Sequence, residues 1–94
     1  MPVGILHLYV RFSGNKSLKE KRGQLLPILQ RLRKEFNVSV VEMELQDRWN
    51  ESVIACAGIS NSREMIYREL QNVASFIPKY YPNVQLVDEK IEIF

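Results

Sequence analysis

The side chains best suited to chemistry in this sequence are the basic ones around its first helical pattern. Residues 16–35 hold seven cations against two carboxylates, a local charge of +5 in a chain whose formal net charge is only +2. Lysine and arginine beside a helix N-terminus offer phosphate oxygens both point charges and backbone donors. The pattern therefore predicts a phosphate-binding surface of the kind that nucleic acids contact.

The residues that we expect to contact nucleic acid are Lys16, Lys19, Lys21, Arg22, Arg33 and Lys34. The same charges have a plain structural explanation, because lysine and arginine on a solvated helix face cover the edge of the core with their aliphatic stems. Salt dependence distinguishes the two interpretations, since phosphate contacts make the affinity fall steeply with ionic strength. Both stay open on the sequence alone.

A catalytic group is hard to assemble from the remaining residues. His7 and Cys56 lie on different predicted strands and form no nucleophile–base pair, and no spacing of Cys or His is typical of a metal site. We therefore expect no enzyme activity, no metal and no cofactor. The enzymatic alternative is acyl-phosphate hydrolysis, because acylphosphatases share the predicted order of elements and hold phosphate in the loop before the first helix. Residues 13–16, near Arg11, lack the glycine-rich, arginine-ending pattern of that loop.

Four strand patterns and two helical patterns must position these residues. Strands are predicted over residues 3–12, 38–45, 53–59 and 84–93, and helices over residues 17–36 and 61–80. The order βαββαβ predicts a ferredoxin-like α+β fold, with a four-stranded antiparallel sheet of order 4-1-3-2 and both helices on one face. Because 94 residues suffice for one core, we expect a single domain over residues 1–94.

Capping patterns and prolines mark the ends of the two helices. Ser17 with Glu20, and Asn61 with Glu64, fit the capping box, in which the acidic side chain reaches back to the backbone N–H of the capping residue. Pro27 predicts a kink in the first helix, and Pro78 predicts a bend or an end in the second.

The first strand has two unlike faces. Its even positions, from Leu6 to Phe12, are all apolar and are predicted to lie under the helices. The odd positions include Ile5 and Tyr9, which a monomer would leave on an uncovered sheet face. An uncovered apolar face marks an interface, so we expect a homodimer through Ile5 and Tyr9. A protein-only interaction module that dimerises here is therefore the alternative to RNA binding.

Trp49 lies in a polar loop and has two explanations. Its ring either anchors a partner, as tryptophan does at many interfaces, or folds back to seal one end of the sheet. We include Trp49 with Ile5 and Tyr9 among the candidate interface residues.

Cysteine usage and hydropathy indicate the compartment. Cys56 is the only cysteine, which excludes an intramolecular disulfide and fits a reducing environment. No run approaches the roughly 18 apolar residues of a membrane span. We therefore expect a cytoplasmic protein without membrane association.

Several blocks of the sequence resemble the YlxP-like family of small bacterial proteins. The blocks are Ser17-Leu-Lys-Glu-Lys-Arg22, Phe36-Asn-Val-Ser-Val40 with Glu42, Gln46-Asp47, Trp49 and Ile59-Ser-Asn61. The resemblance spans nearly the whole chain and implies a ferredoxin-like fold without an established activity. It also implies genes often placed beside those of a translation initiation factor and ribosome-binding factor A. From that neighbourhood we expect ribosomal RNA or a translation factor as the partner, bound through the first helix.

Overall fold

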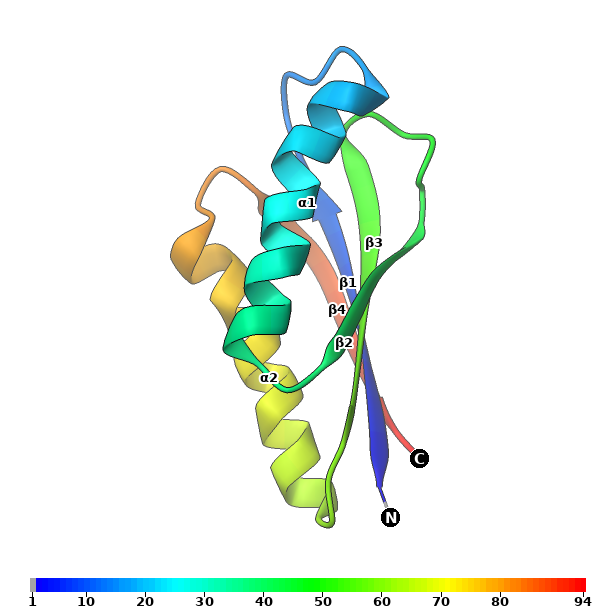
Figure 1. Ribbon diagram of the computed structural model, residues 1–94, viewed down its shortest axis with the longest axis vertical. Helices are drawn as coiled ribbons and strands as arrows, with labels where there is room; N and C mark the ends of the chain where they lie inside the picture. The colour runs from blue at the N-terminus through cyan, green and yellow to red at the C-terminus, as the bar shows by residue number, and fades with distance from the viewer. Residues whose placement is uncertain (1) are drawn as a thin grey trace.

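Four strands and two helices follow one another in the predicted order (Figure 1). The computed structural model describes residues 2–94, and its elements are β1 (Val3–Arg11), α1 (Leu18–Glu35), β2 (Ser39–Glu44), β3 (Glu51–Ile59), α2 (Arg63–Tyr80) and β4 (Gln85–Ile93). The antiparallel sheet has the order β2-β3-β1-β4, and both helices lie on one of its faces. The predicted ferredoxin-like α+β fold is confirmed. Neither helix in this part of the chain is long and apolar enough to cross a membrane.

Alternate side chains of β1 form the centre of the hydrophobic core. Leu6, Leu8 and Val10 are fully buried on the side that the helices cover, as predicted. On β3, Cys56 lies opposite Leu6 and Ile54 lies opposite Leu8, so the two central strands share one apolar face. The helices complete this core with their buried stripes, which comprise Leu25, Ile28, Leu29 and Leu32 of α1 and Ile66, Leu70, Val73 and Ile77 of α2.

Two glycines let α2 come close to the sheet. Gly4 of β1 and Gly58 of β3 lie opposite each other. A Cβ atom on Gly4 would lie 2.7 Å from Leu70 Cδ1, and one on Gly58 would lie 2.8 Å from Ile66 Cδ1. Both distances are shorter than a side chain tolerates, so the helix packs here because these residues have no side chain.

The helix caps differ in detail from the predicted pattern. The Ser17 hydroxyl accepts from the backbone N–H of Glu20 at 3.1 Å, but the Glu20 carboxylate accepts from the N–H of Lys16 and not of Ser17. The cap of α2 is Ser62 rather than Asn61, because Ser62 has the extended backbone of a capping residue and its hydroxyl accepts a first-turn N–H.

The prolines lie inside helices that continue past them. Pro27 lies within α1, which runs as one helix to Glu35. Pro78 lies near the end of α2, which stops two residues later at Tyr80. A proline removes only its own N–H and crowds the preceding turn, so the residues that follow it can stay helical.

β2 departs from simple alternation at its C-terminal end. Glu42 lies opposite Ile54, whereas Glu44 lies opposite Val53, with a register shift between them. Because Ile54 and Val53 occupy opposite faces of the sheet, the bulge leaves Glu42 under the helices and turns Glu44 to the open face. Strict alternation without a bulge would place both glutamates on one face. Leu45 follows the bulge with a φ of 64°.

Candidate functional site

Five of the six candidate nucleic-acid residues form an exposed basic surface on α1 and the loop before it. This basic surface comprises Lys16, Lys19, Arg22, Arg33 and Lys34. At 3.6 residues per turn, Lys19, Arg22 and Arg33 lie on one flank of the helix. The Arg33 guanidinium donates to the Val40 carbonyl at 2.6 Å, so this flank faces β2. Lys19 and Arg33 are separated by about 21 Å along the axis, at 1.5 Å per residue.

Lys21 does not belong to this surface, which corrects the prediction. Its side chain is 1% exposed, and Nζ lies 2.7 Å from Glu42 Oε2 and 2.7 Å from the Leu45 carbonyl oxygen. The Ser52 hydroxyl donates to the same Glu42 oxygen at 2.7 Å. An ammonium group enclosed in this way cannot reach a phosphate. The available signal was Glu42, an acid on a face of its strand that also carries the apolar Val38 and Val40.

The N-terminus of α1 offers less to an anion than its sequence indicated. Ser17 occupies one first-turn N–H, and the Glu20 carboxylate lies beside it, bonded to the N–H of Lys16. This carboxylate places negative charge near the positive end of the helix dipole. Phosphate recognition at α1 would therefore depend on side chains and not on the helix end.

Arg31 faces away from the basic surface. Its Nε donates to Glu35 at 3.0 Å, and its guanidinium carbon lies 5.3 Å and 5.5 Å from the ring centroids of Phe76 and Tyr80. It therefore joins α1 to α2.

A polar cluster that sequence reasoning missed joins the loop before α1 to the loop before β3. The Asn15 backbone N–H donates to Asn50 Oδ1 at 3.0 Å, and Asn50 Nδ2 donates back to the Asn15 carbonyl at 3.2 Å. The Asn15 side-chain amide donates to Gln24 Oε1 and to the Trp49 carbonyl. The backbone donor at the centre of the loop compared with acylphosphatases is thus engaged within the protein. The one signal was the pair of asparagines in adjacent predicted loops, since an amide can donate and accept at once.

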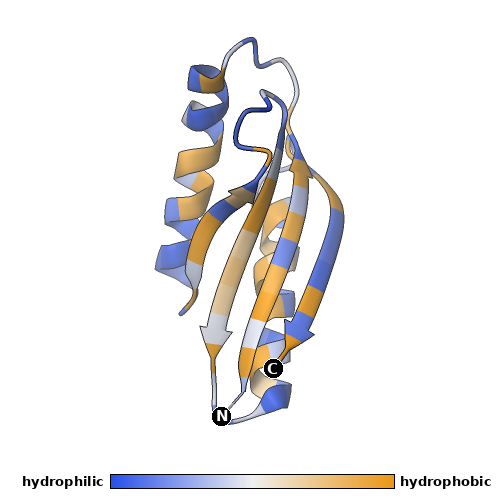
Figure 2. Cartoon of the chain, turned by 90° about the vertical axis from the view of Figure 1, so that its right-hand side faces the viewer, coloured by the Kyte–Doolittle hydropathy of each residue, from blue (hydrophilic) through white to orange (hydrophobic). Residues whose placement is uncertain are grey.

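Two of the three candidate interface residues, Ile5 and Tyr9, belong to the open face of the sheet. Ile5 lies in a row with Ala57 and Glu92, while the Tyr9 hydroxyl donates to the Glu51 carboxylate. Figure 2 views the sheet from its open side, with the helices behind it. The interface role of Ile5 and Tyr9 stays a prediction.

Trp49 lies in the loop before β3 and is 51% exposed. Its backbone carbonyl is held by Asn15, so the main chain is fixed while the ring meets solvent. This exposure leaves its interface role a prediction.

The fold and these surfaces define a small ferredoxin-like α+β domain with one basic helix flank. The chain belongs to the DUF503 family, described as proteins of unknown function, and the match covers residues 3–91. It is 40% identical over 78 residues to the uncharacterized protein YlxP of Bacillus subtilis (strain 168). The aligned residues cover 83% of this chain and 84% of that protein. The resemblance to the YlxP-like family is confirmed. Among residues 2–94, no group of three or more His, Cys, Asp or Glu side chains is placed to hold a metal ion.

Proposed function

We propose that this protein binds RNA in the cytoplasm through the basic surface of α1, with ribosomal RNA as the expected ligand. The observation that supports it is the alignment of Lys19, Arg22 and Arg33 along one flank. None of the three forms an ion pair with another residue in the range 2–94. The charges of Lys19 and Arg22 therefore lack a counter-charge within this range, Arg33 keeps its charge while one of its N–H groups bonds to the Val40 carbonyl, and the charge of Lys21 is matched by Glu42.

The spacing of these cations suits a polymer better than a small anion. The flank extends about 21 Å, so one phosphate group cannot contact both ends of it. A nucleic acid backbone presents successive phosphates, and each contact releases condensed counterions. Binding should thus weaken with salt, with a log–log slope of roughly 0.7 to 0.9 per phosphate contact.

The direct test is the double charge reversal Lys19→Glu with Arg22→Glu. Both side chains are exposed in the first turns of α1, and glutamate forms helices about as well as lysine or arginine. The matched control is Arg63→Glu with Arg68→Glu, an equal charge change in the first turns of α2. Co-sedimentation with ribosomal subunits at two salt concentrations measures binding, and thermal melts show that both variants fold.

We expect the α1 variant to lose co-sedimentation and the α2 variant to keep it. If both variants bind as the wild type does, the basic surface is a solvated helix face and the proposal is wrong. Binding that survives digestion of the RNA and ignores salt would instead support a protein partner, such as a translation factor.

A further inference from the structure

The two edges of the sheet differ in how much hydrogen-bonding capacity they leave free. The β2 edge is short and bulged, and Arg33 occupies the Val40 carbonyl while Lys21 occupies the Leu45 carbonyl. The β4 edge extends over nine residues. Unpaired strand edges of this length readily pair with another chain unless they are blocked.

The register shows which backbone groups of β4 point to the free edge. Val3 and Phe94 exchange both backbone hydrogen bonds, at 3.3 Å and 2.7 Å, so Phe94 faces β1. Along an antiparallel strand, the backbone N–H and C=O groups of successive residues point alternately to one neighbouring strand and to the other. The backbone groups of Glu92 and Lys90 therefore point to β1, as those of Phe94 do. The N–H and C=O groups of Glu89, Ile91 and Ile93 therefore point outward. Of these, the Glu89 N–H is bonded to Asp88 Oδ1 at 2.9 Å.

We propose that this edge pairs with the same edge of a second copy, about a two-fold axis at Ile91, to form one continuous antiparallel sheet. Addition of a strand to a free edge is a common mode of recognition, and a two-fold contact uses the same surface on both copies. The two Ile91 residues then lie opposite each other, and Glu89 of each copy lies opposite Ile93 of the other. The Ile91 pair can exchange both backbone hydrogen bonds, and each Glu89–Ile93 pair can do so once the Glu89 N–H exchanges its bond to Asp88 Oδ1 for one to the Ile93 carbonyl.

Charge complementarity selects this register. With the axis at Ile91, Lys90 of each copy lies opposite Glu92 of the other on the open face of the sheet. An axis at Lys90 would place Lys90 opposite Lys90 and Asp88 opposite Glu92, and an axis at Glu89 would place Glu89 opposite itself. Like charges directly opposite each other are destabilising, and opposite charges are stabilising.

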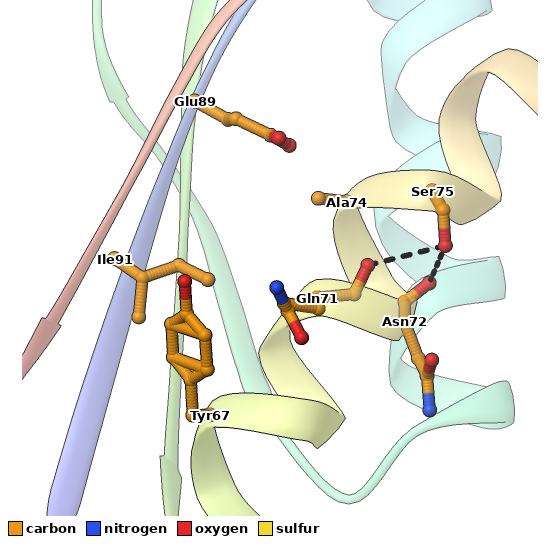
Figure 3. A pocket seen from close by; sticks show the side chains of 7 residues that line it. All are labelled: Tyr67, Gln71, Asn72, Ala74, Ser75, Glu89 and Ile91. Atoms are coloured by element: carbon orange, nitrogen blue, oxygen red, sulfur yellow. Dashed lines mark hydrogen bonds between the residues drawn. The ribbon is translucent and has the colours of Figure 1, made fainter.

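A groove of mixed polarity lies beside the edge (Figure 3) and is lined in part by the polar side chains of Gln71, Asn72, Ser75 and Glu89. The groove has a volume of about 420 Å³ between α2 and β4, and Tyr67, Ala74 and Ile91 are among its lining residues. Tyr67 is 43% exposed. On the helix-covered side, the axis brings Ile91 of one copy to Ile91 of the other, with a Tyr67 ring near each. Pairing of the edges therefore also buries apolar surface.

This dimer is independent of RNA binding. The flank of α1 with Lys19, Arg22 and Arg33 faces β2, at the opposite edge of the sheet from β4. A dimer through β4 would therefore display two basic surfaces on its outer sides. The dimer through Ile5 and Tyr9 is the competing arrangement.

A charge swap tests the proposed register. Sedimentation equilibrium of the full chain should give twice the chain mass of 11.0 kDa. Lys90→Glu or Glu92→Lys alone should weaken dimerisation at least about tenfold, because each substitution places like charges opposite each other. The double variant restores opposite charges and should restore the dimer. RNA binding should be unchanged in all three, so this test can fail while the proposed function holds.

A proline variant tests the backbone pairing itself. Glu89→Pro removes an outward N–H and leaves the bonds to β1 intact, as proline does on edge strands. It should give a folded monomer, whereas Lys90→Pro should destabilise the domain because that N–H faces β1.

Three results would overturn the proposal. One is a wild-type mass of a single chain up to millimolar concentration. The second is a folded Glu89→Pro variant that remains a dimer. The third is a dimer that persists in both Lys90→Glu and Glu92→Lys. If that dimer is lost in Tyr9→Glu, the interface lies on the open face of the sheet.

Discussion

Lys21 Nζ lies 2.7 Å from Glu42 Oε2 at a position where the lysine is 1% exposed and the glutamate 18%. The same ammonium group donates to the carbonyl of Leu45, whose φ of 64° begins the turn after β2. One side chain thus joins α1 to β2 and fixes the start of the following loop. Removing two ions from water is unfavourable by several kcal/mol each, and their mutual attraction offsets this only while both remain.

Breaking this pair from either side should have unequal effects. Glu42→Gln is expected to destabilise the fold by about 3–5 kcal/mol, because it leaves the buried ammonium without a counter-charge. Lys21→Met should cost less, because Glu42 keeps the Ser52 hydroxyl and some contact with water. Urea unfolding of both variants and of Lys21→Met with Glu42→Gln measures the coupling. Strictly additive losses would show that the two groups do not interact.

Alanine substitution at two glycines should change the stability of the protein in opposite directions. Gly4→Ala is expected to cost about 1–3 kcal/mol, because its Cβ would lie 2.7 Å from Leu70 Cδ1 in a packed core. Gly23→Ala should stabilise the protein by about 0.5–1 kcal/mol, since no atom beyond its chain neighbours and the adjoining helix backbone lies within 4 Å of the added Cβ, and alanine favours the helix. Thermal melts that move in the same direction for both would contradict the packing described for α2.

Alternation and helical spacing were enough to predict the fold. The even positions of β1 are buried as predicted, and β3 lies inside the sheet beside β1, as the predicted strand order requires. The site was predictable only in part, because Lys21 lies at the border of the apolar stripe of α1. Whether such a lysine turns outward or inward depends on Glu42, which belongs to another element. The bulge that moves Glu44 to the other face is likewise set by pairing with β3.

Cys56 should be chemically silent in the folded protein. Burial raises the pKa of its thiol from 9.0 to about 12, and only the thiolate reacts with alkylating reagents. Labelling by iodoacetamide at neutral pH should therefore follow global unfolding along a urea titration. Rapid labelling of the native protein would show that β3 opens locally.

The raised pKa of Cys56 also gives stability a pH dependence. The fold favours the neutral thiol, so this contribution is complete below pH 9.0 and is lost as pH rises from there through about 12. Urea midpoints of the wild type and Cys56→Ala, compared below and above pH 9.0, isolate the thiol. The difference between the two urea midpoints should be smaller above pH 9.0 than below it. A difference that does not change with pH would contradict the raised pKa of the Cys56 thiol.

Core truncation separates buried from exposed leucines. Leu70→Ala is expected to cost about 2–5 kcal/mol, because Leu70 is fully buried between α2 and the sheet. Leu26→Ala, on the exposed side of α1, should change stability by less than about 0.5 kcal/mol. Denaturant unfolding with unchanged m-values checks both. Equal effects would mean that the apolar stripe of one helix is assigned to the wrong face.

The pairing of β1 with β4 places a demand on synthesis and folding. Gly4 lies opposite Ile93, so β1 pairs with the strand that is synthesised last. Until β4 has been made, one edge of β1 has no hydrogen-bonding partner. Such distant pairing raises the contact order, and chains of this kind fold more slowly than helical bundles of similar size. A nascent chain can pair β1 with β3 while one flank of β1 is still open. During that interval the edge of β1 beside the apolar residues Leu6 to Val10 is exposed. An exposed strand edge of this kind can bind a chaperone or pair with the wrong strand before folding is complete.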